Sequence, residues 1–187
     1  MRNYAMRLFA GVSVSYEVRR NIELLVKHLK SAADLKWSPP ENLHITTRFV
    51  GEWPETRVDE LVAALRSVPM PPPFELSIAG LGWHPNPHQP RVFFAGVPGS
   101  EQLAALAREI DVALEKIGLP PEAKPFNPHL TLARIKPPVE LAALRQAIAA
   151  LPSADFGRFT VSKHLLFESK PGTAASRYSV IAEFPLA

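Results

Sequence analysis

The feature that most constrains this chain is an order of elements that occurs twice. Each half reads as a strand, a helix, a strand that begins with a His-x-Thr motif, a second helix and a further strand. Arg7 lies 37 residues before His44, and Arg91 lies 38 residues before His129. Offsets that agree this closely predict an internal duplication. We therefore expect one domain over residues 1–187 that is made of two pseudo-symmetric lobes.

The expected elements follow from apolar spacing and from the clusters of proline that separate them. The first half should contain strands at about 7–14, 43–50 and 74–81, a helix capped by Ser15 that runs to Leu29, and a second helix at about 55–67. The second half should contain strands at about 91–97 and 129–135 and helices at about 100–118 and 139–150. Two closing strands, at about 156–167 and 177–186, should be joined by a turn at Pro171-Gly172.

The two motifs are His44-Ile45-Thr46-Thr47 and His129-Leu130-Thr131-Leu132. Side chains alternate between the two faces of a strand, so His and Thr of each motif share one face while the apolar residues point into a core. An approximate twofold axis relating two sheets would place the two histidines opposite each other across a cleft.

Two facing imidazoles suit acid–base chemistry, since the ordinary histidine pKa near 6.5 allows one ring to be neutral and the other protonated at neutral pH. The hydroxyls of Thr46 and Thr131 can donate hydrogen bonds to the non-bridging oxygens of a phosphate. Such a site can hydrolyse a phosphodiester without a metal ion, because positioning and charge stabilisation supply most of the catalysis. A strained cyclic phosphate is an especially suitable substrate.

The other histidines lack these matched surroundings. His84 and His88 lie in a proline-rich loop and are expected to be exposed, His28 lies on the polar side of the first helix, and His164 is expected to be structural. No carboxylate or third histidine stands at ligand spacing near His44 or His129, so a two-histidine metal site is disfavoured.

Composition sets outer limits on function. The chain has no cysteine, which excludes a disulfide framework and a thiolate metal site, and its net charge of +3 suits a phosphorylated ligand without providing a nucleic-acid tail. No stretch approaches the roughly 18 apolar residues that span a bilayer. A cytoplasmic monomer without membrane association is the expectation.

Longer stretches around the motifs resemble a known family. His-Ile-Thr-Thr-Arg-Phe-Val-Gly (44–51) and Pro-His-Leu-Thr-Leu-Ala-Arg (128–134) are similar to the paired signatures of the two-histidine (2H) phosphoesterases. The flanking Arg7-Leu-Phe-Ala, Lys36-Trp-Ser-Pro-Pro-Glu-Asn-Leu and Leu166-Phe-Glu-Ser with Tyr178 resemble the RNA 2′,3′-cyclic phosphodiesterase branch, formerly called 2′-5′ RNA ligase. The resemblance covers essentially the whole chain.

The resemblance implies a bilobal α/β (α+β) fold in which two mainly antiparallel sheets flank a central cleft, with helices outside. It implies hydrolysis of RNA 2′,3′-cyclic phosphate ends to 2′-phosphomonoesters, with no metal or other cofactor. By position, His44 would be the proton donor and His129 the acceptor that activates water, while Thr46 and Thr131 would hold the phosphate.

Two arginines are candidates for substrate contact. Arg134 matches the arginine that ends the second motif, but strict alternation places it on the face opposite His129, so a bulge or strand end is needed there. Arg48 shares parity with His44, and the family usually has a basic residue at this position. For both arginines a structural role remains open. Thr47, where the family usually has leucine, should affect packing rather than chemistry. Phe9 is expected in the core, and stacking on a base is the alternative.

Alternative functions follow from the same residues. One is hydrolysis of a small cyclic nucleotide or ADP-ribose cyclic phosphate, and another is a non-catalytic module that binds RNA ends. The binding module predicts loss of a motif residue, yet both histidines and both threonines are present. Weak reverse 2′-5′ ligation is a further expectation, because a ribose hydroxyl can replace the attacking water.

Overall fold

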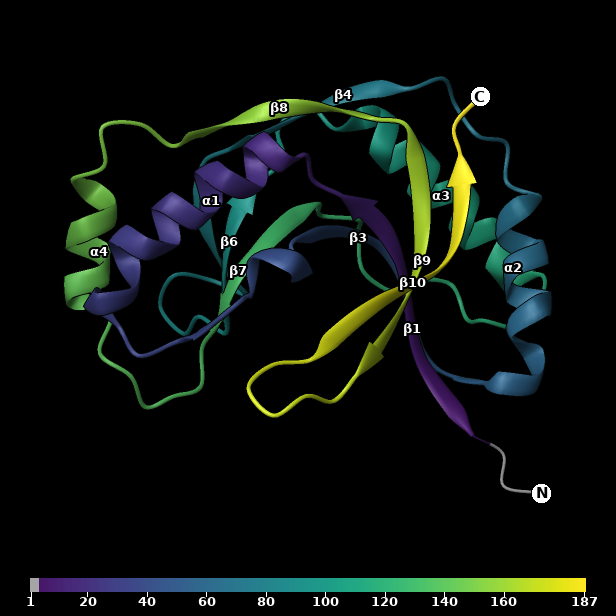
Figure 1. The fold of residues 1–187 in the computed structure, drawn as a ribbon, viewed down its shortest axis with the longest axis horizontal. Coiled ribbons are helices and arrows are strands. Elements are labelled where there is room, and N and C mark those ends of the chain that lie inside the picture. The colour runs from purple at the N-terminus through teal and green to yellow at the C-terminus, as the bar shows by residue number, and fades with distance from the viewer. Residues whose placement is uncertain (1–3) are drawn as a thin grey trace.

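The structure is a computed structural model that describes residues 4–187. Its helices are α1 (Tyr16–Leu29), α2 (Val58–Arg66), α3 (Glu101–Glu115) and α4 (Ala142–Ala149). Its strands are β1 (Ala5–Ser13), β2 (Lys36–Trp37), β3 (His44–Pro54), β4 (Phe74–Ala79), β5 (Leu81–His84), β6 (Val92–Gly96), β7 (His129–Arg134), β8 (Asp155–Val161), β9 (Lys163–Lys170) and β10 (Arg177–Pro185). Figure 1 shows α4 at one end of the molecule and α2 at the other, with the strands between them.

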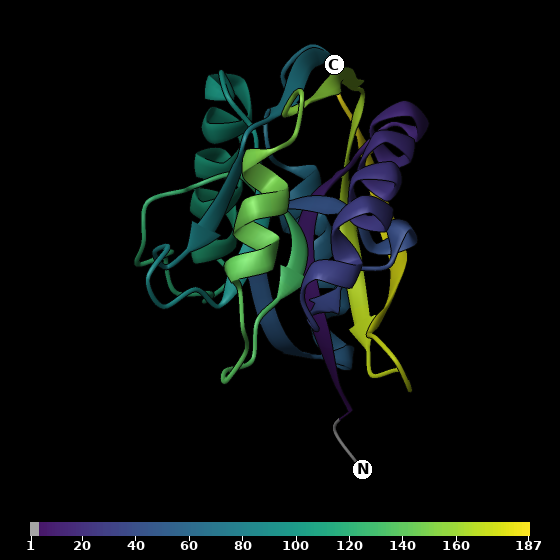
Figure 2. The same ribbon diagram turned by 90° about the vertical axis from the view of Figure 1, so that its left-hand side faces the viewer.

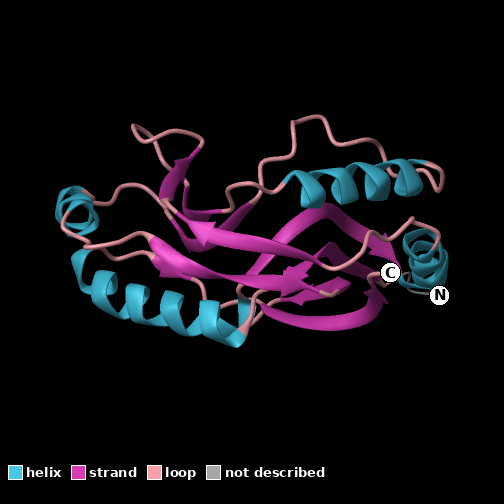
Figure 3. Cartoon of the chain, turned by 90° about the horizontal axis from the view of Figure 1, so that it is seen from above, coloured by secondary structure: helices cyan, strands magenta, loops and turns pink. Residues whose placement is uncertain are grey.

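The strands form one large sheet and one small sheet, and every pairing is antiparallel. The large sheet has the order β10-β9-β1-β3-β7-β6-β5, with β2 paired to β7, and the small sheet contains β4 and β8. Seen from above, the strands occupy the middle of the molecule and the helices surround them (Figure 3). The mixed α/β class with two antiparallel sheets is confirmed.

The strand order of the large sheet has the symmetry that the sequence suggests. β3 and β7, which carry the two motifs, are neighbours at its centre, and β1 and β6 lie on their outer sides. Ile45 pairs with Leu130. The expectation that the motifs face each other from two sheets is therefore corrected, because the halves join by hydrogen bonding β3 to β7 within one sheet.

The closing strands differ from the sequence expectation. The sequence predicts one strand over residues 156–167, but Ser162 separates β8, which pairs with β4, from β9, which pairs with β1 and β10. Both strands bury apolar side chains, so the apolar pattern continues through the change of sheet and does not reveal it. The short strand β5 is not expected from the sequence. All four of its residues are half-buried, so it lacks the alternation of buried and exposed residues by which strands are recognised.

The apolar face of the large sheet packs against the helices in two clusters. The larger cluster joins Ile45 and Leu130 to the buried stripe of α1, and the second joins β1 and β3 to α2 and α3. Ser15 caps α1 by accepting a hydrogen bond from the Val18 amide at 3.2 Å, as expected. The helices thus cover one face of the central strands, and the motif side chains occupy the other face.

Candidate active site

The two motifs bring four polar side chains together on one face of the large sheet. His44 and His129 each begin a central strand, and Thr46 and Thr131 follow two residues later. All four side chains are half-buried, whereas Ile45 and Leu130 between them are fully buried on the other face. The period of two along each strand, together with the central β3–β7 pairing, produces this cluster.

Both histidine rings are held in the same way. Nδ1 of His44 lies 2.6 Å from the backbone oxygen of Asn42, and Nδ1 of His129 lies 2.8 Å from the backbone oxygen of Asn127. A carbonyl oxygen only accepts hydrogen bonds, so Nδ1 carries a proton in both rings. In the neutral form, Nε2 of each ring is then the basic nitrogen.

The surroundings of His44 are apolar. Its ring centroid lies 4.6 Å from that of Phe9, 5.7 Å from that of Phe167 and 5.2 Å from that of Tyr178. Burial among these rings lowers the pKa of His44 to about 4, and the nearby charges of Arg134 and His129 act in the same direction against the hydrogen bond to Asn42. His44 is therefore neutral when the site is empty. Its Nε2 lies 2.9 Å from the Thr46 hydroxyl. Phe9 is 4% exposed, which agrees with its expected core position.

The surroundings of His129 are more open and contain a third histidine. The ring of His84 lies 4.8 Å from that of His129 in an edge-on arrangement and stacks on Phe94 at 4.3 Å. The Asn127 amide nitrogen lies 3.4 Å from Nε2 of His84. Partial burial, together with the charge of His129, lowers the pKa of His84. The expectation of an exposed loop position is therefore wrong for His84, which is half-buried at the end of β5, and is confirmed for His88.

A bulge in β7 places Arg134 on the face of the histidines. Phe94 of β6 pairs with Thr131, and Phe93, the residue before it, pairs with Ala133. Leu132 therefore has no partner in β6 and is an additional residue of β7. The bulge reverses the alternation beyond Leu132, and Arg134 then shares a face with His129. The effect of Arg134 on the pKa of His44 agrees with this placement. The bulge that the sequence argument required is present.

The equivalent bulge in β3 has a different result. Gly11 pairs with Thr46 and Ala10 pairs with Arg48, so Thr47 is the additional residue. Arg48 is turned away from the histidine face, and Phe49, which is 59% exposed, occupies the position that corresponds to Arg134.

Arg48 is consequently a structural residue. Its Nε lies 2.8 Å from an Asp111 oxygen and its Nη1 lies 2.9 Å from a Glu122 oxygen, while Nη2 donates to the backbone oxygen of Pro120. The side chain is 8% exposed. The expectation that Arg48 faces the phosphate is corrected, because the bulge at Thr47 reverses its direction. Arg48 instead ties β3 to α3 and to the segment that leads to His129.

His164 completes the support beneath the first motif. It is fully buried, and its Nε2 lies 2.8 Å from the Thr47 hydroxyl. Burial lowers its pKa to about 4, so it is neutral at pH 7. This contact agrees with a structural role for His164 and with a packing role for Thr47.

The candidate site also depends on groups to which the sequence argument assigned no role. They are the two asparagine carbonyls and the rings of His84, Phe94 and Phe167. The asparagine two residues before each histidine was a visible signal, whereas the contact of His84 with His129 depends on strand pairing. Within residues 4–187, no group of three His, Cys, Asp or Glu side chains is placed to hold a metal ion. No helix of that range is long and apolar enough to cross a membrane.

Comparison with known proteins agrees with this geometry. The family model described as LigT like Phosphoesterase matches twice, over residues 12–94 and 96–175. A protein of Methanothermobacter thermautotrophicus named RNA 2′,3′-cyclic phosphodiesterase is 35% identical over 97% of this chain and 99% of its own length. A protein of the same name from Aquifex aeolicus is 30% identical over 97% of each chain.

Solved structures share the fold. The crystal structure of TT0787 of Thermus thermophilus superposes with a TM-score of 0.81 at 30% identity, covering 97% of this chain and 98% of that one. Escherichia coli LigT complexed with 3′-AMP superposes with a TM-score of 0.79 at 22% identity, covering 98% and 99%. The two family matches each contain one His-x-Thr strand of the central pair. This chain therefore belongs to the LigT-like phosphoesterases, the two-histidine phosphoesterase family.

Proposed function

We propose that this protein hydrolyses 2′,3′-cyclic phosphate ends of RNA to 2′-phosphomonoesters, with His44 and His129 as the acid–base pair. The observation that carries the proposal is the matched anchoring of the two rings. Each Nδ1 donates to a backbone carbonyl, which leaves each Nε2 to exchange a proton on the same face of one sheet.

The reaction follows from this arrangement. Nε2 of His129 takes a proton from a water molecule, and the water oxygen attacks phosphorus in line with the bond to the ribose O3′. The P–O3′ bond breaks, and Nε2 of His44 gives its proton to O3′. The products are a 3′-hydroxyl and a 2′-phosphomonoester. Thr46 and Thr131 donate to the non-bridging oxygens, and Arg134 compensates the negative charge that develops there.

The low pKa of His44 defines when it is protonated. In the empty site, burial keeps the ring neutral, and the Thr46 hydroxyl is close enough to donate to Nε2. A bound phosphodiester anion favours the imidazolium, because an opposite charge within hydrogen-bond distance raises the pKa of histidine. His44 would therefore take up its proton together with the substrate, and Thr46 would turn to the phosphate.

The substrate class rests on the relatives. Proteins named RNA 2′,3′-cyclic phosphodiesterase are 35% and 30% identical over 97% of this chain. The same proton transfers, with a ribose 5′-hydroxyl in place of the attacking water, join that hydroxyl to the 2′,3′-cyclic phosphate, so we also expect weak 2′-5′ ligation. Neither reaction needs a metal ion or another cofactor.

The test is to incubate the purified protein with EDTA and a short RNA that ends in a 2′,3′-cyclic phosphate, and to identify the product by phosphorus NMR. A 2′-phosphomonoester is expected, and added magnesium should not change the rate. Loss of activity in EDTA that metal restores would contradict the metal-independent mechanism. If only nucleoside or ADP-ribose cyclic phosphates are hydrolysed, the substrate is a small cyclic phosphate and not RNA. If the folded protein hydrolyses none of these substrates, a non-catalytic module that binds RNA ends is favoured.

A further inference from the structure

A cavity of about 790 Å³ opens beside Arg134, next to the candidate active site. It is lined by residues of the segment that connects α1 to β2 and of the segment that connects β7 to α4. Figure 2 shows the end of the molecule where these two segments run. Its cationic lining residues are Lys36, Arg134 and Lys136, and its acidic ones are Asp34 and Glu140. The charged lining therefore carries a net positive charge.

The sheet register connects this cavity to the histidines. Lys36 of β2 pairs with Arg134 of β7. Directly paired residues of antiparallel strands project to the same face, so Lys36 lies on the face that carries the histidines and Arg134. Lys136 follows two residues beyond Arg134 and lines the same cavity. The three cations therefore lie on the His44 side of the candidate site, where the charge of Arg134 also lowers the pKa of His44.

The three cations are not neutralised by ion pairs. Among the residues that the structure describes, no carboxylate oxygen lies within 4.0 Å of the charged nitrogens of Lys36, Arg134 or Lys136. Arg48, by contrast, has two acidic partners and is buried. Exposed cations around an open cavity attract phosphate groups, and single-stranded nucleic acids follow such positively charged grooves.

We propose that this cavity binds the sugar–phosphate backbone of RNA on the 5′ side of the cyclic phosphate. The inference rests on the proposed function and extends it from the terminal phosphate to the preceding nucleotides. His44 protonates O3′, so the terminal ribose lies on the His44 side, and the chain that continues from its 5′ oxygen leaves toward Arg134, Lys36 and Lys136. Pockets of about 300–1,000 Å³ hold ligands of drug size, so the cavity has room for a nucleotide.

The other half of the molecule differs at the corresponding position. Phe49 occupies the position that corresponds to Arg134, and Glu122 of the segment before His129 is engaged by Arg48. Arg134, the cation that joins the cavity to the histidine face, therefore has no counterpart at the corresponding position of the first half.

The experiment compares substrate lengths. The values of kcat/KM are measured at low salt for adenosine 2′,3′-cyclic phosphate and for a five-nucleotide RNA with the same end, using the unaltered protein and the double variant Lys36→Ala/Lys136→Ala. The variant should lose about tenfold in kcat/KM on the RNA, mainly through KM, and stay within about twofold on the mononucleotide. The slope of log kcat/KM against log salt on the RNA should become shallower by about 1.4, since each contact to a single strand contributes about 0.7.

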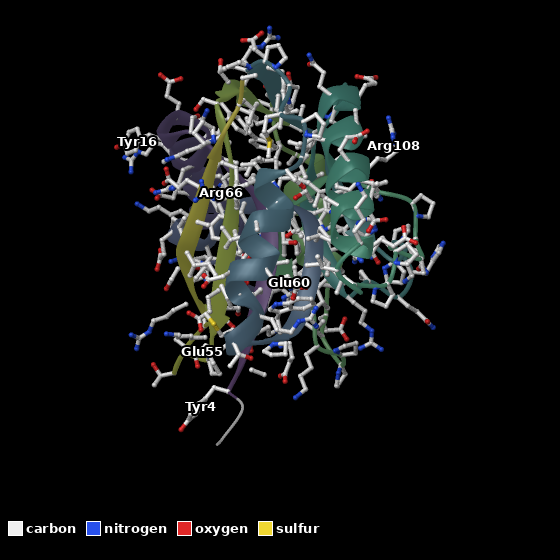
Figure 4. The ribbon with its side chains drawn as sticks, turned by 90° about the vertical axis from the view of Figure 1, so that its right-hand side faces the viewer. Tyr4, Tyr16, Glu55, Glu60, Arg66 and Arg108 are labelled. Atoms are coloured by element: carbon white, nitrogen blue, oxygen red, sulfur yellow. The ribbon has the colours of Figure 1, made fainter. Side chains whose placement is uncertain are left out.

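The matched control is Arg108→Ala/Lys116→Ala, which removes the same charge from α3 and its C-terminal end; Figure 4 labels Arg108 on that helix. This control should leave both substrates within about twofold. The proposal is overturned if the cavity variant loses equally on both substrates, if the control loses as much on the RNA, or if the unaltered protein shows no preference for the longer substrate.

A binding measurement separates this inference from the proposed function. Fluorescence anisotropy with a five-nucleotide RNA that ends in a 2′-phosphate should give about tenfold weaker binding for the cavity variant than for the α3 control. If no substrate is hydrolysed but this difference is found, the proposed function fails and the RNA site stands. Equal binding by both variants would overturn the RNA site even if hydrolysis is observed.

Discussion

The two halves of the molecule use one scaffold to present two different histidines. In each half the histidine begins a central strand, its Nδ1 donates to an asparagine carbonyl, and the residue after the motif threonine forms a bulge. The surroundings differ, because His44 is enclosed by aromatic rings and has a pKa of about 4, whereas His129 is more open and contacts His84. The duplication thus fixes where the rings lie, and the flanking residues make them chemically unlike, as an acid–base pair requires.

The same comparison applies to the residues at the bulges. The first half places Thr47 and Arg48 beneath the sheet, where they contact His164 and the acidic partners Asp111 and Glu122. The second half places Leu132 and Ala133 there and returns Arg134 to the site face. A duplicated strand can therefore supply structural support in one copy and place a cationic side chain on the histidine face in the other.

Replacing either motif histidine should have the largest effect. His44→Ala and His129→Ala should each lower kcat by about 10³-fold or more, since general acid–base groups contribute about 10²–10⁴-fold. Circular dichroism should show an unchanged fold, and His88→Ala, in the exposed loop, should keep full activity. A nearly normal kcat for either variant would show that the replaced histidine takes no part in the reaction, and that only one half of the molecule supplies a catalytic histidine.

The buried His164 should make stability depend on pH. Its pKa is about 4 when folded and about 6.5 when unfolded, so between these values the unfolded chain binds a proton that the folded chain does not. The free energy of unfolding should therefore rise with pH across this window, by up to about 3 kcal/mol from this residue, and His44 acts in the same direction.

The double variant Thr47→Val/His164→Leu tests this contribution. It replaces the polar contact at the bulge of β3 with an apolar one, and the corresponding bulge residue of β7, Leu132, is already apolar. Urea denaturation at pH 4.5 and pH 7 should show a smaller difference in stability for this variant than for the unaltered protein. An equal difference in both proteins would show that His164 does not carry the pH dependence.

Adjacent threonines on opposite faces should separate catalysis from stability. Thr46→Val removes a hydroxyl from the proposed phosphate site and should lower kcat/KM by about 10–100-fold with little change in stability. Thr47→Val leaves Nε2 of buried His164 without its partner and should cost about 1–3 kcal/mol of stability with normal kcat/KM. Equal effects of the two substitutions on activity would contradict the face assignment.

The smallest effect is a displacement between two pH profiles. The pH dependence of kcat/KM reports the free enzyme, in which the pKa of His44 is about 4, whereas that of kcat reports the complex, in which the phosphate anion raises this pKa. The optimum of kcat should therefore lie at higher pH than that of kcat/KM. Coincident profiles would mean that substrate does not change the protonation of His44.

Much of the fold and part of the site are accessible from sequence because they depend on local periodicity. Strand alternation places His44 with Thr46 and His129 with Thr131, and the nearly equal offsets of the two halves indicate the duplication. Pairing between strands is not local, so sequence reasoning misses the adjacency of β3 and β7 and the change of sheet at Ser162. Bulges add one residue without changing composition, and for that reason strict alternation assigns Arg48 to the wrong face. The position of His84 beside His129 depends likewise on the β5–β6–β7 register.

The most direct test of the central claim, that the two halves carry out opposite proton transfers, uses a substrate whose leaving atom needs no proton. A 2′,3′-cyclic phosphate with sulfur in place of O3′ expels a thiolate, so it should be hydrolysed by His44→Ala at nearly the rate of the unaltered protein. His129→Ala should stay inactive, because water still has to be activated. Failure to restore His44→Ala, or restoration of His129→Ala instead, would contradict the assignment of the acid to the first half and the base to the second.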